Sequence, residues 1–124
     1  MRPKSTTLTA HELEIMKIVW RRGQATVRDV YHEMLERRSI AYTTVMSELK
    51  TLDQKGYLRT SQQDRAYVYR PRRAKNLVIR QMVREFVDRV FNGSAQPLLV
   101  HLLEDEHLSE ADLREISRMK GKKR

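Results

Sequence analysis

The chain has 124 residues, of which 40% are hydrophobic and 33% charged, and its formal net charge is +9. This length and composition suit one globular domain with an appendage and argue against wholesale disorder. The absence of cysteine excludes disulfides, thiolate metal sites and cysteine nucleophiles, while the positive charge favours an anionic partner, either nucleic acid or a membrane surface.

No apolar run reaches the length that crosses a membrane, and the basic start of the chain lacks the hydrophobic stretch of a signal peptide. We therefore expect a cytoplasmic protein without membrane insertion. That the charge merely solvates the surface remains open at this point.

Two capped helices are predicted first. Thr9 and Glu12 have the spacing of a capping box, and Gly23 is a natural stop for the helix that follows. Thr26 and Asp29 repeat the capping pattern, and the second helix is expected to end near residues 37–39. Apolar residues at helical spacing give both helices a buried face.

A third helix is predicted over residues 42–55, and Gly56 ends it. The hydrophobic period then changes from 3.6 to 2, which predicts strands at 57–60 and 65–69 around a polar turn at 61–64. Three helices followed by a hairpin are typical of a winged helix, a helix-turn-helix that carries a β wing.

The last third of the chain is predicted to form three further helices. The first starts near Ala74 and breaks at residues 92–94, Pro97 sits in the first turn of the second, and Ser109 with Asp112 caps the third. Residues 120–124 form a basic tail that is expected to fray.

These helices carry wide apolar faces, which we expect a second copy of the chain to cover. The alternative is that they fold back onto their own N-terminal domain. The residues predicted at the dimer contact are Ile79, Met82, Val83, Phe86, Val90, Leu98, Leu99, Leu102, Leu103, Leu113 and Ile116.

The predicted fold is mainly α with a small β-hairpin wing. We place a winged-helix DNA-binding domain at residues 1–72 and a helical dimerisation domain at 73–124. Residues 1–73 hold 15 basic and 8 acidic residues, a net charge of +7, whereas residues 74–124 hold 10 and 8, a net charge of +2. The anion-facing surface is therefore expected on the winged helix.

In a winged helix the third helix enters the major groove of DNA and the wing contacts the flanking backbone or minor groove. Predicted DNA contacts are Thr26, Arg28, Ala41, Tyr42, Thr43, Thr44, Met46, Ser47, Lys50, Gln62 and Arg65. Thr methyl groups, Tyr42 and Met46 can pack on thymine methyls, and Lys50 suits a phosphate.

Several of these residues have plainer interpretations. Thr43 or Thr44 could only cap the third helix, Met46 could belong to the core, and Arg65 could be a solvated turn residue. One face of the alternating stretch 66–69, with its two tyrosines, is expected to pack inside.

The segments 40–58 (IAYTTVMSELKTLDQKGYL) and 64–71 (DRAYVYRP) resemble the penicillinase repressor family, the BlaI/MecI/CopY type. Segments 8–20, 25–34 and 91–116 continue the likeness over nearly the whole chain. The resemblance implies a homodimer with a winged helix over Leu8–Pro71 and a dimerisation region over Ala74–Lys123. It also implies a palindromic operator beside genes for β-lactamase, penicillin-binding protein or copper homeostasis.

In the antibiotic branch of the family, a membrane sensor-protease pathway leads to cleavage of the repressor within its dimerisation region. The staphylococcal repressors are cut at an Asn–Phe bond, and the matching position here is His101–Leu102. The alternative is that these two residues are only helix surface and core.

Two further departures from the family pattern matter. A copper-thiolate switch is excluded because the chain has no cysteine. The staphylococcal proteins carry Lys and Arg where Thr43 and Met46 stand, so the operator sequence should differ.

No catalytic site, metal site or cofactor is predicted. The four histidines lack metal-ligand spacing, the acidic stretch at 104–107 is interpreted as a solvated loop, and no nucleophile–base set or phosphate loop stands out. The alternatives to an operator-specific repressor are a winged-helix module that binds an acidic protein and a nucleoid-type DNA binder without sequence preference.

Overall fold

The structure is a computed structural model that describes residues 7–122; Lys123 and Arg124, the last two residues of the predicted tail, lie outside them. The chain divides into a first unit that ends at Ile79 and a second that begins at Arg80. This division falls inside helix α4 (Lys75–Phe91), because Val78 is buried in the first unit. The predicted boundary after residue 72 lies ahead of the helix.

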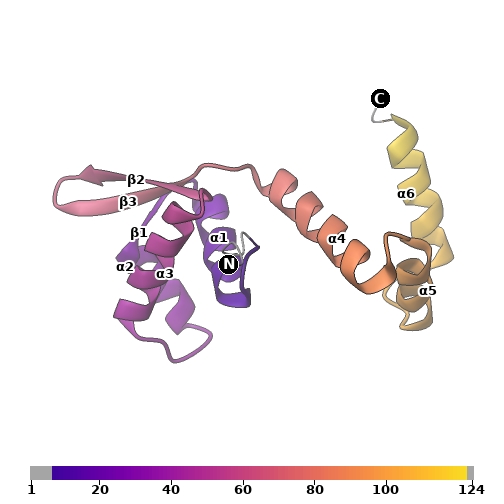
Figure 1. Ribbon diagram of the computed structural model, residues 1–124, viewed down its shortest axis with the longest axis horizontal. Coiled ribbons are helices and arrows are strands. Elements are labelled where there is room, and N and C mark those ends of the chain that lie inside the picture. Colours follow the sequence, from indigo (N-terminus) through magenta and orange to yellow (C-terminus); the bar gives the residue numbers. More distant parts are fainter. Residues whose placement is uncertain (1–6, 123–124) are drawn as a thin grey trace, which may run out of the picture. The chain divides into compact units, whose positions relative to one another are not determined.

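The first unit consists of three helices and a small antiparallel sheet, and in Figure 1 the hairpin projects from the helices. The sheet has the strand order β1-β3-β2. The predicted class, mainly helical with a small β wing, is confirmed. The elements are α1 (Ala10–Arg22), β1 (Ala25–Thr26), α2 (Val27–Leu35), α3 (Tyr42–Gln54), β2 (Leu58–Gln63) and β3 (Ala66–Pro71).

Both predicted capping boxes of this unit are confirmed. The Glu12 N–H donates to Thr9 Oγ1 over 3.1 Å, and the Thr9 N–H donates to Glu12 Oε1 over 2.9 Å. Thr26 and Asp29 make the same exchange at the start of α2. Gly23 ends α1 with a φ of 86°, a conformation that glycine adopts without strain.

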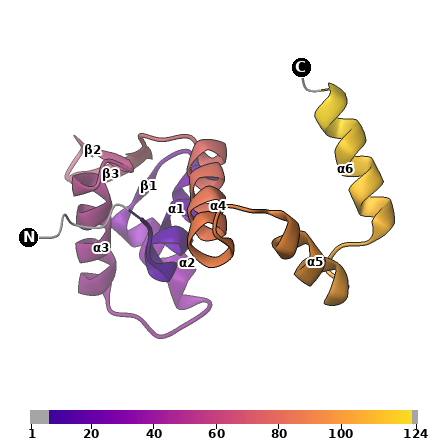
Figure 2. The same cartoon turned by 45° about the vertical axis from the view of Figure 1, so that its right-hand side comes forward.

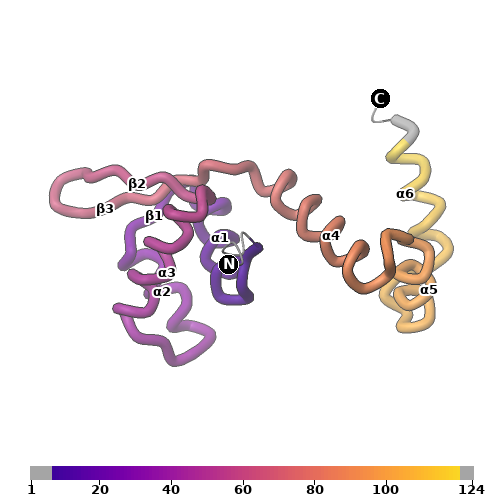
Figure 3. Tube along the Cα trace, in the orientation of Figure 1, coloured from indigo at the N-terminus to yellow at the C-terminus, as the bar shows by residue number. Residues whose placement is uncertain are grey.

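Three details of the predicted elements were wrong. The turn at 61–64 is shorter than expected, since pairing between β2 and β3 continues to Gln63 and Ala66 and Asp64 turns the chain with a φ of 53°. Figure 3 follows the backbone through this hairpin. Strand β1 was not predicted, because two residues carry no periodic signal. Helix α2 ends at Leu35, ahead of the predicted exit at 37–39.

The core of the first unit lies where the three helices meet the base of the sheet. Its largest fully buried side chains include Ile15, Met34, Leu49 and Leu58. Figure 2 shows α3 beside the base of the hairpin, consistent with the contacts between α3 and β2. Helix α3 and the wing therefore share one packed core.

The second unit holds the rest of α4 with α5 (Gln96–Glu104) and α6 (Glu110–Lys122). Pro97 lies in the first turn of α5, and the predicted capping pair of Ser109 and Asp112 is confirmed at α6. Helix α6 continues to Lys122, two residues beyond the start of the predicted tail at Lys120.

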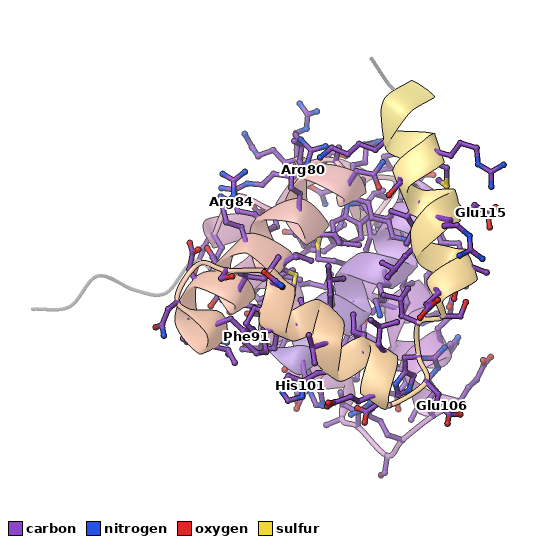
Figure 4. All side chains as sticks on the ribbon, turned by 90° about the vertical axis from the view of Figure 1, so that its right-hand side faces the viewer. Arg80, Arg84, Phe91, His101, Glu106 and Glu115 are labelled. Carbon is purple, nitrogen blue, oxygen red and sulfur yellow. The ribbon has the colours of Figure 1, made fainter. Side chains whose placement is uncertain are left out.

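Apolar side chains are sparsely covered in the second unit. Val87 is the only buried one that this unit contributes, counting the described residues alone. Phe86 packs edge-on against Phe91, and the Phe91 ring lies 5.9 Å from that of His101. Figure 4 shows Phe91 at the end of α4 and His101 on α5.

Candidate nucleic-acid interface

A groove of about 480 Å³ lies between α3, the start of α2 and the wing. Three segments that are distant in sequence thus meet at one surface of the first unit. The groove brings together six of the predicted DNA contacts, namely Thr26, Arg28, Tyr42, Met46, Lys50 and Arg65.

One row of α3 faces this groove. Tyr42, Met46 and Lys50 recur at steps of four residues, the spacing that places side chains one above another on a helix. The Tyr42 ring packs edge-on against Tyr31 of α2 at a centroid distance of 5.2 Å. That contact orients Tyr42 before any ligand arrives.

The groove carries positive charge without its own counter-charge. Arg28, Lys50 and Arg65 are all exposed, and no acidic residue belongs to the groove lining. None of the three makes an ion pair with another described residue. Such a surface attracts a polyanion, and each cation can neutralise one phosphate.

Several cations elsewhere on this unit are paired. Arg21 and Arg22 both bind the Glu33 carboxylate, and the Arg22 contact measures 2.7 Å. Although burial by itself raises the pKa of Glu33, the hydrogen bonds from the two guanidinium groups outweigh it, and the net pKa is lowered. Lys55 is largely buried, and its Nζ lies 2.8 Å from Glu12 Oε1. The three cations of the groove differ from these in having no acidic partner among the described residues.

The two helices of the helix-turn-helix begin differently. The Thr26 N–H is already donated to Asp29, which lowers the pKa of that carboxyl, so a phosphate at α2 would meet Arg28 and other groups of the first turn. Helix α3 begins at Tyr42, its N-cap residue is Ala41, and no side-chain hydrogen bond caps it. Its first N–H groups therefore have no side-chain acceptor, and uncapped N–H groups of this kind can bind an anion such as a phosphate.

The absence of a side-chain cap also excludes the alternative that Thr43 or Thr44 only caps α3. Thr43 and Thr44 are exposed and neither caps α3, so both hydroxyl groups face solvent. Ser47 lies one turn after Thr43 and is exposed as well. Thr43, Thr44, Ser47 and Ala41 lie outside the groove lining, on the remaining exposed surface at the start of α3.

A chain of polar contacts holds the wing to α3. Thr60 of β2 donates a hydrogen bond to the Asp53 carboxylate near the end of α3. Thr60 also hydrogen-bonds Tyr69 of β3, whose pKa is raised because its phenol is buried. Below them, the Trp20 Nε1–H donates to the Arg73 carbonyl over 2.9 Å. The wing base cannot shift without breaking these contacts.

Two tyrosines on the wing complete the groove, and sequence reasoning did not assign them to it. Tyr69 is buried, as expected for the packing face, whereas Tyr67 is 56% exposed. Gln62 pairs with Tyr67 across the hairpin but does not line the groove. The alternation of residues 66–69 predicted that Tyr67 and Tyr69 lie on the same face of the strand. That this face is turned toward α3 is shown only by the tertiary structure.

The predicted dimer residues are half-exposed or exposed in the single chain. The exposed ones are Ile79, Val83, Phe86, Val90, Leu99 and Ile116, at 36% to 51%, and the half-exposed ones are Met82, Leu98, Leu102, Leu103 and Leu113. The bond between His101 and Leu102 lies inside α5, with His101 exposed and Leu102 partly covered.

Neither unit offers a metal site or a membrane span within residues 7–122. No group of three or more His, Cys, Asp or Glu side chains there could hold a metal ion. No helix of that part is long and apolar enough to cross a bilayer.

Comparison with known proteins gives concordant matches. The family model described as penicillinase repressor matches residues 8–120. The transcriptional regulator BlaI of Mycobacterium tuberculosis is 37% identical over 111 residues, which cover 88% of this chain and 80% of that protein.

Two solved structures of the repressor BlaI match the first part of the chain at 26% identity and cover 60% of it. One is its DNA-binding domain, with a TM-score of 0.53 and 90% of that chain covered. The other is the monomeric form from Bacillus licheniformis in complex with the blaP half-operator, with a TM-score of 0.50 and 87% covered.

Proposed function

This chain belongs to the penicillinase repressor family, whose members are DNA-binding repressors and not enzymes, and on that premise we propose that two copies bind a palindromic operator and silence the adjacent genes. The observation that carries the proposal is the groove with three unpaired cations beside α3. In this arrangement the start of α3 enters the major groove, while Arg28, Lys50 and Arg65 hold the backbone.

Dimerisation is proposed through the apolar face of the second unit. Phe86, Val83 and Val90 lie on one side of α4 and stay exposed, although burial of each would be favourable. A two-fold interface buries the same patch twice, so one chain supplies both halves of the contact. Two winged helices joined in this way read two half-sites, and operator affinity rises steeply over that of a single domain.

We further propose that induction removes this interface. Cleavage at or near His101–Leu102 by a membrane sensor-protease pathway would separate α6 from α4 and return the protein to single-domain affinity. Because the bond lies within α5, the protease needs α5 to unwind locally. The proposed targets are genes for β-lactamase, penicillin-binding protein or related stress functions, and the proposed location is the cytoplasm.

A gel shift with the DNA upstream of the chain's own gene tests the proposal. We expect a complex that survives excess competitor DNA and whose affinity falls steeply with salt, because each neutralised phosphate releases counterions. Equal binding to every duplex would instead support a nucleoid-type binder. Retention of an acidic protein without any DNA complex would support an interaction module.

A further inference from the structure

We propose that this chain reads its half-site mainly through thymine methyl groups, which Tyr42 and Met46 contact. The inference rests on the proposed function and names the base chemistry that the operator must offer. It starts from the side chains that α3 presents and from those that it lacks.

The first turns of α3 contain no side chain suited to bidentate readout of a purine. Residues 42–47 read Tyr-Thr-Thr-Val-Met-Ser, whereas guanine is read by Arg or Lys and adenine by Asn or Gln. Lys50 comes one turn later and lines the groove with the other cations. Glu48 faces the Nδ1 atom of His11 at 3.3 Å, on another side of the helix. Bidentate recognition of guanine or adenine is therefore not available to these turns, which leaves single hydrogen bonds from hydroxyl groups and apolar contacts.

The same turns present apolar groups to the groove. Tyr42 is 42% exposed, and Met46 follows one turn later on the same row. Both side chains line the groove together with the apolar Val27 and the wing residue Tyr67, so they belong to an apolar strip between the cations. The apolar group that the major groove offers is the C5-methyl of thymine.

The cations around Tyr42 and Met46 favour a contact with DNA bases over an unspecific apolar contact. Arg28 lies on α2 and Arg65 at the wing tip, so the unpaired cations come from both sides of α3. Tyr31 holds the Tyr42 ring in place, which lowers the entropy that the ring loses on binding. Thr43 is exposed at the start of the same helix, and its methyl group can add a further contact.

The test begins with the full chain and a pool of random duplexes, from which bound sequences are selected. In the selected half-site, each thymine is then replaced by deoxyuridine, which removes only the methyl group. We expect about a fourfold loss of affinity at a contacted thymine in one half-site, the value of one buried carbon group. Replacing it in both half-sites should cost about fifteenfold, while replacement outside the half-sites should change nothing.

Variants assign the contact to a residue. Met46→Ala should abolish the deoxyuridine effect at one position, whereas Met46→Leu should retain it because an apolar side chain of similar length remains. Gln54→Ala is the matched control, since Gln54 is exposed on the same helix, outside the groove and outside the predicted DNA contacts. Circular dichroism checks that each variant keeps its helices.

Two results would overturn the inference. A selected sequence whose affinity is unchanged by deoxyuridine at every thymine rules out methyl readout but leaves the repressor proposal standing. A pool that yields no preferred sequence removes both, so the two failures are distinguishable.

Discussion

The two units of this chain treat apolar residues in opposite ways. In the first unit, side chains such as Ile15, Leu49 and Leu52 are fully buried among α1, α2, α3 and the sheet. In the second, Phe86, Val90 and Ile116 recur at comparable helical spacing and remain 41% to 51% exposed. Periodicity alone does not distinguish these two cases.

This difference in apolar exposure indicates what kind of partner suits each unit. The first unit satisfies its apolar surface within the chain and leaves unpaired cations outside, which suits a polyanion. The second leaves apolar surface outside, which suits another protein surface. The proposed function therefore places DNA binding and self-association in separate parts of the chain, and we expect that each can be broken alone.

The largest effect is expected from a charge on the exposed face of the second unit. Phe86→Glu should convert the dimer to a monomer, because pairing would bury two unpaired carboxylates. Operator affinity should fall by about 10² to 10⁴, the gain that linkage of two sites provides. Sedimentation velocity and a gel shift measure both. Gln81→Glu places the same charge on an exposed polar position of α4 and should leave the dimer intact.

A comparison of two leucines sharpens the contrast. Leu49→Ala should lower the free energy of unfolding by about 2–5 kcal/mol, because Leu49 is fully buried and a cavity remains. Leu99→Ala, made in the monomeric Phe86→Glu background, should lower it by less than about 0.5 kcal/mol. Urea denaturation measures both values. Equal losses would mean that α5 has a core of its own.

The groove cations give a smaller and more specific effect. Lys50→Ala should weaken operator binding by about tenfold and reduce the slope of log affinity against log salt by about 0.9. Lys17→Ala removes the same charge from an exposed position on α1 outside the groove. If the two variants lose equal affinity and slope, binding depends on net charge alone.

The smallest effect concerns the α2 capping box. The Thr26 N–H bond lowers the pKa of Asp29, so the folded state binds this proton less readily than the unfolded chain. The resulting stability is present above the ordinary pKa of about 3.9 and is lost as the pH falls through the lowered value.

Asp29→Asn should therefore flatten the acid side of the stability curve, measured by thermal melts from pH 5 downward in steps of about one unit. Asp88→Asn, an exposed carboxylate on α4, is the control. An unchanged acid slope in Asp29→Asn would show that the capping carboxylate contributes nothing in solution.

Short-range features of the fold were predictable from sequence. The pairs led by Thr9, Thr26 and Ser109 cap their helices because both partners lie three residues apart. Strand β1 was not predictable, since its two residues become a strand only by pairing with Tyr69 and Val68 of β3.

The sequence allowed most residues of the candidate site to be named, but not how the fold brings them together. The position of Met46 followed from helical period, yet its place beside Tyr67 depends on how the hairpin packs against α3. The distinction between paired and unpaired cations also depends on tertiary contacts, as Lys55 and Lys50 on neighbouring turns illustrate.

The most direct test asks whether the first unit binds DNA while the second unit joins two copies of the chain. It uses two duplexes built from the selected operator, one with both half-sites and one with a single half-site. The full chain should bind the palindrome as two copies, at least about a hundredfold more tightly than the half-site. Phe86→Glu should bind both duplexes with the affinity of the half-site. A wild-type chain that binds both equally well, as one copy, would contradict the account.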